Sequence, residues 1–129
     1  EGMDLSPLAF GKKWEEPDFA FMQGMGHTFQ WKDGHEWRAV RDKRYTYAKY
    51  LVDGKELLFD NVNDPKQTKN LVAEPEFAEI LVGKRQQMAS KMKELNDEFK
   101  PCSWYRGHWV DENRCIRAAA KGKFCQDGF

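Results

Sequence analysis

Residues 44–60, RYTYAKYLV-DG-KELLFD, decide the fold. Two runs rich in aromatic and branched residues, which favour strands, flank the dipeptide Asp53-Gly54. Asp-Gly supplies the positive φ angles of a two-residue type I′ turn, whose twist matches that of the flanking strands. The pattern therefore predicts an antiparallel hairpin that pairs Tyr50 with Leu57 and places both on one face together with Phe59.

Two further strands precede this hairpin. The runs 18–23 (DFAFMQ) and 37–41 (WRAVR) are rich in strand-forming residues. The second run alternates cleanly, so that Arg38 and Val40 point to one face and the residues between them to the other. Between the two runs, residues 24–36 hold three glycines, two histidines and a tryptophan, and we interpret them as a loop.

A long helix follows the hairpin. Pro75 suits the first helical turn, and the acidic residues beside it favour the positive end of the helix dipole. Apolar residues then recur at three- and four-residue steps up to Phe99, so we expect a helix over 75–99 that ends at Lys100-Pro101. The element order predicts an α+β fold, with an antiparallel sheet of about four strands and one long helix packed across a face.

Composition limits the possible functions. The 129 residues contain 21 Lys plus Arg and 21 Asp plus Glu, so the formal net charge is zero. A zero charge argues against a general binder of nucleic acid or of anionic membranes. No apolar run approaches the roughly 18 residues of a membrane span. A charged fraction of 33% is high for a self-sufficient domain of this size, which indicates a part of a larger protein.

The sequence contains no complete catalytic set of a hydrolase, and we assign no catalytic or metal-binding residue. It has no G-x-S-x-G elbow, P-loop or H-E-x-x-H motif. Cys102, Cys115 and Cys125 form an odd set without a C-x-x-C pair, so one disulfide plus a thiol and three reduced thiols both stay open. His27 and His35 have few carboxylates nearby, which favours hydrogen bonding over metal ligation.

A basic cluster lies at Arg38, Arg41, Lys43 and Arg44. Alternation in a strand divides these side chains between two faces, which favours a solvated edge. If Arg38 or Arg41 faces a cleft, its guanidinium suits bidentate binding of a sulfate or a carboxylate.

In its order of features, the stretch 37–81 resembles the C-terminal subdomain of sulfatases. That family has a W-R-A-V-R strand, a tyrosine-rich strand, a hairpin leading to an E-L-Y-D-L-like strand, then N-D-P, N-L-A and a closing helix. The corresponding residues here are Trp37–Arg41, Arg44–Tyr47, Glu56–Asp60, Asn63–Pro65 and Asn70–Val72. With the opening DLSPLAFGKK included, the resemblance covers residues 4 to about 99.

The resemblance implies a parent enzyme whose large N-terminal α/β domain carries formylglycine and calcium (or magnesium). None of those motifs matches a position here, so we expect no cofactor in this chain and no activity from it alone. Cys102–Arg106 (CSWYR) has Trp104 where the formylglycine signature C-x-P-x-R has proline, and we interpret it as a coincidence. We expect residues 1–17 to connect to the catalytic domain, 18–110 to form the subdomain and 111–129 to form a tail.

The family's C-terminal subdomain packs on the large domain and helps to select a sulfated sugar or aryl sulfate. By that resemblance, His27, Trp31, His35 and, more weakly, Arg38 are candidate substrate contacts. We also expect an exposed apolar surface where the large domain would lie, and a periplasmic or extracellular location. The alternative is a free-standing module that binds a glycan or a protein.

Overall fold

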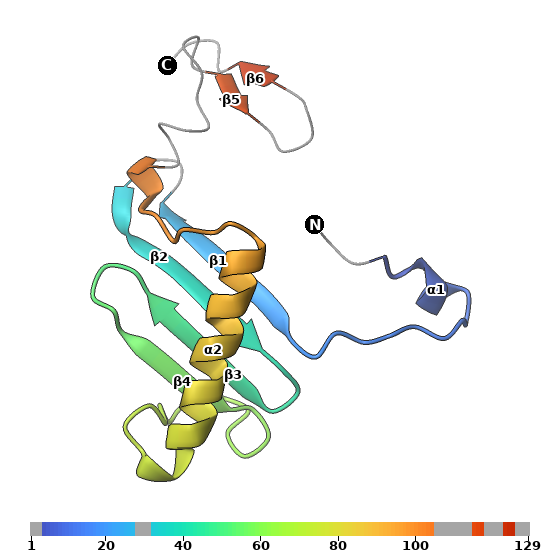
Figure 1. Ribbon diagram of the computed structural model, residues 1–129, viewed down its shortest axis with the longest axis vertical. Coiled ribbons are helices and arrows are strands. Elements are labelled where there is room, and N and C mark those ends of the chain that lie inside the picture. Colours follow the sequence, from blue (N-terminus) through green and yellow to red (C-terminus); the bar gives the residue numbers. More distant parts are fainter. Residues whose placement is uncertain (1–3, 28–31, 105–114, 118–122, 126–129) are drawn as a thin grey trace.

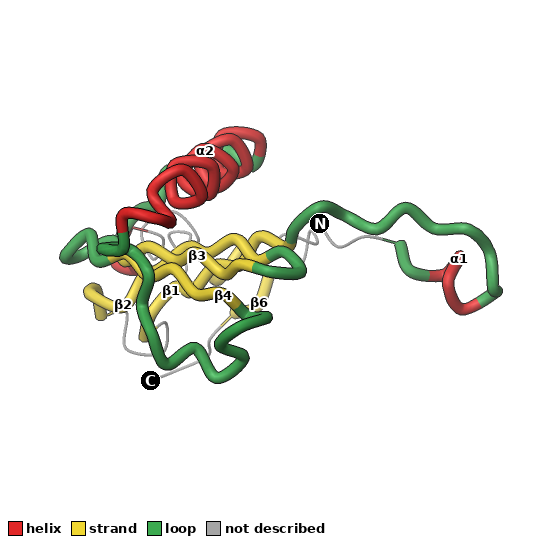
Figure 2. Tube along the Cα trace, turned by 90° about the horizontal axis from the view of Figure 1, so that it is seen from below, coloured by secondary structure: helices red, strands yellow, loops and turns green. Residues whose placement is uncertain are grey.

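The computed structural model describes residues 4–27, 32–104, 115–117 and 123–125. Four antiparallel strands pair in chain order and form one sheet (Figure 1): β1 (Ala20–His27), β2 (Lys32–Arg41), β3 (Tyr45–Tyr50) and β4 (Glu56–Asp60). Helix α2 (Ala78–Glu94) lies across one face of this sheet, as Figure 2 shows from below. The predicted α+β architecture is confirmed.

The β3–β4 hairpin has a different register from the predicted one. Ala48, rather than Tyr50, lies opposite Leu57. The backbone N–H of Tyr50 donates to the carbonyl of Lys55 at 2.9 Å, so the chain turns over residues 51–54 and not over Asp53-Gly54 alone. The next N–H, that of Leu51, donates to the carbonyl of Glu36 in β2 at 3.0 Å. The shift is two residues, and the side-chain period of a strand is also two. The faces predicted for Tyr50 and Leu57 are therefore correct although the partners are wrong.

Residues 24–36 do not form the predicted loop, because β1 and β2 run through most of them. Their register pairs Gly24 with Trp37 and, after an irregularity, His27 with Lys32. A Cβ atom added to Gly24 would lie 2.2 Å from Nε1 of Trp37. The glycine thus makes room for a cross-strand indole, which is a recognised use of glycine within a strand.

Helix α2 begins after a single 3-10 turn, Pro75–Phe77, and ends five residues before the predicted position. Asn96 takes a left-handed conformation with φ 52°. Its N–H donates to the carbonyl of Lys93 (3.2 Å), and the N–H of Asp97 donates to that of Met92 (2.8 Å). These two bonds are the Schellman motif, which satisfies the last helical carbonyls and stops the helix.

The core lies between α2 and the sheet. Its buried members come from three strands, the β4–α2 connector and the helix: Val40, Tyr45, Tyr47, Leu58, Leu71, Leu81 and Met88. Lys84 of α2 is also buried and pairs with Asp42, which follows β2. Burial of these apolar side chains fixes α2 over the sheet.

The sheet has two different ends. At the hairpin end lie the paired residues His27 and Lys32 of β1 and β2, and residues 51–55, which join β3 to β4. At the turn end lie residues 42–44 and the start of the long connector 61–74. Since α2 runs from the turn end to the hairpin end (Figure 1), its C-terminus lies near the β1–β2 hairpin.

The two chain ends carry further elements. Residues 4–17 extend away from the sheet (Figures 1 and 2) and contain the short helix α1 (Ser6–Ala9). Around it Leu5, Leu8 and Phe10 are 56%, 52% and 75% exposed. Within the stretch interpreted as a tail, β5 (Cys115–Arg117) pairs with β6 (Lys123–Cys125).

Candidate functional site

Among the described residues, β1 and β2 carry two of the four candidate substrate contacts, His27 and His35, to the hairpin end. His27 is the last residue of β1, and the structure describes only its backbone. His35 follows three residues after the start of β2 and has an exposed side chain. Trp31 lies outside the described residues. The fold thus places His27 and His35 on one hairpin, while Arg38 lies closer to the middle of the sheet.

The side chain of Arg38 is buried and paired within the protein. Its side chain is 0% exposed, and its guanidinium binds both carboxylate oxygens of Asp97, with Nη2 to Oδ1 at 2.8 Å. Nη1 donates to the carbonyl of Trp37 at 3.0 Å, and the ring of Phe99 lies 4.7 Å from Cζ. Substrate sulfate could reach this guanidinium only by displacing Asp97. Its observed contacts make Arg38 a residue that positions its neighbours.

The carboxylates of Asp33 and Glu36 in β2 bind the chain segment that follows α2. Cys102 donates its N–H to Oε1 of buried Glu36 at 2.6 Å. Ser103 donates its N–H and its hydroxyl to Asp33, at 2.6 and 2.7 Å. Residues 97–103 therefore run beside β2 toward the hairpin end. Cys102 is fully buried, which keeps its thiol away from a dissolved substrate.

The basic residues of 38–44 do not converge on one anion site. Lys43 pairs with Glu16 at 2.7 Å, and both side chains are exposed. Arg44 pairs with buried Asp60 at 3.2 Å. These two pairs lie at the turn end, far along the strands from the candidate histidines.

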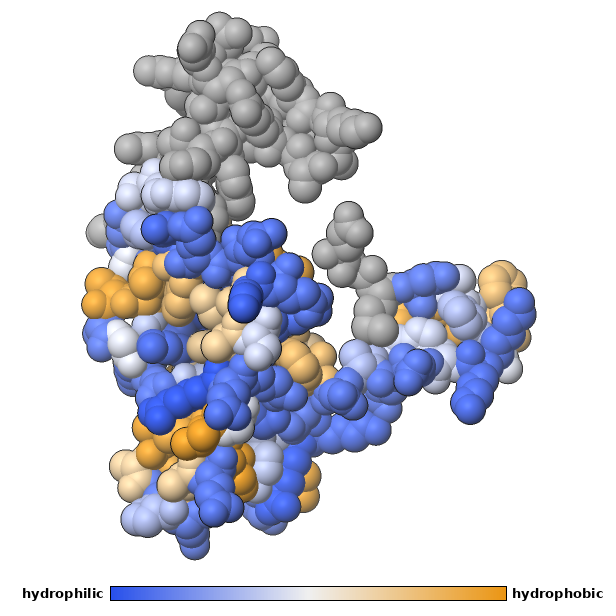
Figure 3. Space-filling model, viewed as in Figure 1, coloured by the Kyte–Doolittle hydropathy of each residue, from blue (hydrophilic) through white to orange (hydrophobic). Residues whose placement is uncertain are grey.

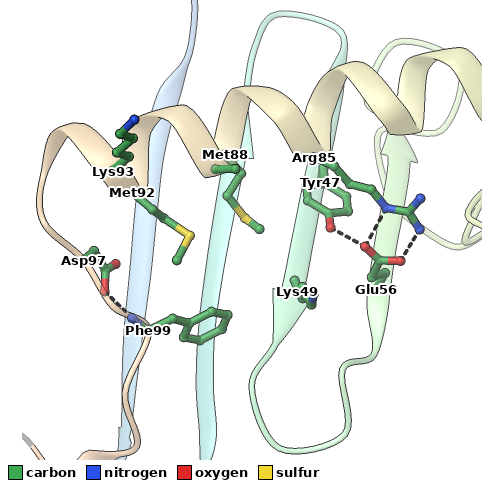
Figure 4. Close-up of a pocket in the computed structure, with 10 residues that line it drawn as sticks. Tyr47, Lys49, Glu56, Arg85, Met88, Met92, Lys93, Asp97 and Phe99 are labelled. Carbon is green, nitrogen blue, oxygen red and sulfur yellow. Dashed lines mark hydrogen bonds and ion pairs between the residues drawn. The ribbon is translucent and has the colours of Figure 1, made fainter.

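A groove of about 640 Å³ lies between the C-terminal half of α2 and the hairpin ends of β3 and β4 (Figure 4). We name it the α2 groove. Apolar side chains from the helix and from the segment after it line one part: Met88, Met92 and Phe99. Tyr47 and the charged side chains of Lys49, Glu56 and Arg85 line another part. In Figure 3, which shows the helix side of the molecule, apolar surface gathers beside this half of α2.

Glu56 is held at one end of the groove by two donors. Arg85 donates through Nε to Oε1 at 2.8 Å and through Nη2 to Oε2, and the hydroxyl of Tyr47 also donates to Oε1. The Arg85 bonds are the largest cause that lowers the pKa of Glu56 to about 2. Burial and the Glu56 carboxylate raise the pKa of Tyr47. The carboxylate therefore stays ionised and the phenol stays protonated at neutral pH, which makes them fixed polar groups.

The sequence analysis did not predict the α2 groove, because it interpreted the apolar residues of the 75–99 helix only as the side that packs on the sheet. One signal was present. Strand alternation puts Lys49 on the same face as Tyr47, so a lysine lies on the side of the sheet that the helix covers.

Three or more metal-ligating side chains do not come together anywhere in the described residues. The helices of that same part of the chain include none that could cross a membrane.

Comparison with known proteins identifies the scaffold. No protein-family model matches the chain. An ulvan-active sulfatase of Formosa agariphila is 35% identical over 105 residues, which are 81% of this chain and 20% of that protein. A Delta 4,5-hexuronate-2-O-sulfatase of Bacteroides thetaiotaomicron is 28% identical over 107 residues, covering 77% of this chain and 20% of the relative. The solved structure of a 2-O GAG sulfatase superimposes with a TM-score of 0.67 at 26% identity, over 76% of this chain and 21% of that one.

The chain belongs to the sulfatase family. It corresponds to the C-terminal subdomain and spans about one fifth of the length of the curated relatives that it matches. The predicted resemblance is confirmed.

The structure explains why the sulfatase-like motifs at the turn end contain Asp60, Asp64 and Asn70. Oδ1 of Asp60 accepts the N–H groups of Val62 and Asn63, at 3.0 and 3.1 Å. Oδ2 of Asp64 accepts two further backbone N–H groups, and Oδ1 of Asn70 accepts the N–H of Leu58 in β4 at 2.9 Å. These motif residues of the sulfatase subdomain therefore satisfy backbone donors in the connector, as turn-forming Asp and Asn residues do.

Proposed function

We propose that this chain completes a sulfate-ester hydrolase by closing the substrate pocket beside a catalytic domain. The observation that carries the proposal is the match to proteins named as sulfatases over 81% and 77% of the chain. Those relatives act on ulvan or on a 2-O-sulfated hexuronate by their names, so the proposed substrate is a sulfated sugar. The alternative of a free-standing binding module has no comparable support.

In this proposal the catalytic domain holds the reacting groups. The described residues do not fit a divalent cation, since no cluster of ligating side chains is present among them. We therefore assign the calcium and the formylglycine of the parent enzyme to its other domain and derive no step from them. This chain contributes binding surface and is inactive when alone.

We assign the substrate contacts of this chain to His27 and His35 at the hairpin end and to Trp31, which lies between them in the sequence. An imidazole can donate to a sulfate or sugar oxygen, and an indole can cover the apolar face of a pyranose. Arg38 supports them from behind, because its pair with Asp97 ties β2 to the segment after α2. That support keeps the hairpin in place when a polymer binds.

The N-terminal segment is the proposed contact with the catalytic domain. The exposed side chains of Leu5, Leu8 and Phe10 give this short segment an apolar surface that the described chain leaves uncovered. A patch of this kind is typical of a surface that meets another domain.

The test is turnover of sulfated oligosaccharides by the parent enzyme and by this chain alone. We expect release of sulfate only from the parent. In the parent, His35→Ala should lower kcat/KM about tenfold or more on the oligosaccharide, as for loss of one charge-assisted or neutral hydrogen bond in a pocket. The matched substitution Lys55→Ala, at the tip of the other hairpin, should leave it unchanged. Turnover by the isolated chain would refute the assignment of the reacting groups.

A further inference from the structure

We propose that the α2 groove binds a second acidic sugar unit, a pyranose with one sulfate or carboxylate group, away from the reacting unit. This inference rests on the proposed function, because the sugar belongs to the same polymer. It assigns a binding role to residues that the sulfatase motifs do not include.

The first support is an excess of positive charge at one part of the groove. Lys49 is half-buried, lies on the helix side of β3 and lines the groove. It makes no hydrogen bond with any residue in the described part of the chain. Its charged neighbour is the cross-strand carboxylate of Glu56, which Arg85 also binds, so two cations share one carboxylate. A partly desolvated ammonium is most stable beside an anion. The groove thus has a place for one negative group.

The second support is an aromatic wall held in an unusual backbone conformation. Phe99 has φ 51°, which is rare for a bulky residue. Its N–H donates to Oδ1 of Asp97 at 2.9 Å, and its ring lies over the guanidinium of Arg38. Backbone strain of this kind is found at ligand-binding clamps. The ring and the side chains of Met88 and Met92 offer an apolar surface to the C–H face of a pyranose (Figure 4).

The third support is the mixture of charges, which suits a sugar better than an acidic peptide. A carboxylate offers about four acceptor positions, and Glu56 uses three of them for Tyr47 and Arg85. The remaining position can accept a sugar hydroxyl. The same carboxylate would repel a segment with several acidic side chains, whereas a sugar combines one anionic group with neutral hydroxyls.

The location agrees with a polymeric ligand. The α2 groove opens at the hairpin end of the sheet, where His35 also lies. Residues 97–103 run from the groove along β2 toward that hairpin. A sugar chain held at the hairpin can therefore continue into the groove over the same end of the molecule.

The experiment uses this chain with ¹³C-labelled methionine methyl groups and a sulfated tetrasaccharide as probe. We expect the methyl signals of Met88 and Met92 to shift on titration, after their assignment with Met→Leu variants. Lys49→Gln should weaken binding at least tenfold, and Lys55→Gln, a matched exposed lysine outside the groove, should not change it. The desulfated neutral tetrasaccharide should bind at least tenfold more weakly. Equal midpoints of thermal unfolding would establish that both variants fold.

Three results would overturn the inference. The groove methyl signals could fail to move, Lys49→Gln could bind as Lys55→Gln does, or the neutral sugar could bind equally well. A fourth contrary result is a change of the Met88 and Met92 signals in the parent enzyme without sugar, together with no response of this chain to sugar. That result would show a polypeptide in the groove.

The parent enzyme separates this inference from the proposed function. Hydrolysis of a small aryl sulfate by the parent tests the proposed function alone, since such a substrate does not reach the groove. If the parent hydrolyses no sulfate ester and this chain still binds the sugar through Lys49, only the proposed function fails. If the parent is active and Lys49→Gln changes neither binding nor turnover of the polymer, only the groove assignment fails.

Discussion

Asp97→Asn should lower the free energy of unfolding by about 3 kcal/mol. Arg38 is 0% exposed and the Asp97 side chain is 7% exposed, so the substitution leaves a buried guanidinium without its counter-charge. Breaking a buried pair from one side costs about 3–5 kcal/mol. Asparagine keeps one oxygen that can accept from Arg38 or from the N–H of Phe99, which places the expected loss at the lower end.

The assay is urea unfolding of this chain, followed by tryptophan fluorescence. With an m-value of about 1.5 kcal/mol/M, a loss of about 3 kcal/mol moves the midpoint by about 2 M. Glu94→Gln is the matched control, because it breaks the exposed pair with Lys91 near the end of the same helix. Exposed pairs contribute about 0–1 kcal/mol, so this control should move the midpoint little.

A double variant tests the reasoning itself. Arg38→Met in the Asp97→Asn background removes the second charge, and it should recover at least about 1 kcal/mol relative to Asp97→Asn alone. The explanation by an uncompensated charge is refuted if the double variant is less stable than the single one. It is refuted equally if Asp97→Asn lies within about 1 kcal/mol of the wild type.

Three further outcomes are expected. The lowered pKa of Glu56, about 2 against 4.5, means that its pair with Arg85 stabilises the fold above pH 4.5 and that this contribution is lost as the pH falls toward 2. Because Arg85 is 46% exposed, we expect this contribution to be only about 1–2 kcal/mol. Urea unfolding at pH 3 and pH 7 measures it, and Glu56→Gln should reduce the difference in unfolding free energy between the two pH values by that amount. The same difference in the variant and the wild type would contradict this prediction. Gly24→Ala should lower the free energy of unfolding by about 1–3 kcal/mol, measured by thermal unfolding, because the new Cβ meets the indole of Trp37. Unchanged stability would contradict the close packing of Trp37 on Gly24. Gly83→Ala, with no atom within 4 Å of the new Cβ in α2, should gain about 0.5–1 kcal/mol in the same assay, and a loss would contradict the open environment.

Periodicity predicted the β3–β4 strands, the helix and the faces of their residues because those depend on local geometry alone. The alternation of 37–41 already put Arg38 on the same face as Val40, which is a buried position. That placement weakens an anion-binding role for Arg38, and the structure supplies the buried partner Asp97. The pairing is 59 residues apart in the chain, so no local pattern could reveal it.

The errors in the prediction arise where a distant group competes with a local preference. Asp53-Gly54 favours a two-residue turn, but Tyr50 bonds to Lys55 and Leu51 bonds to β2, so the turn takes in residues 51–54. Gly24 suggests a loop until Trp37 is known to lie across from it. The Schellman motif at Asn96 is a further local signal that the sequence analysis overlooked, since Asn is accepted in the left-handed conformation.

The split between the two ends of the sheet explains why the family is easier to infer than the substrate. At the turn end, carboxylates such as Asp42 and Asp60 bind backbone N–H groups within a few residues, so their spacing along the chain is constrained by the turns. Motifs with fixed spacing therefore report the scaffold. At the hairpin end, contacts such as Cys102 to Glu36 join residues 66 apart, and the proposed ligand contacts are not held in place by local turns. Substrate choice can then vary on an unchanged scaffold, and it must be measured on the groove and hairpin residues themselves.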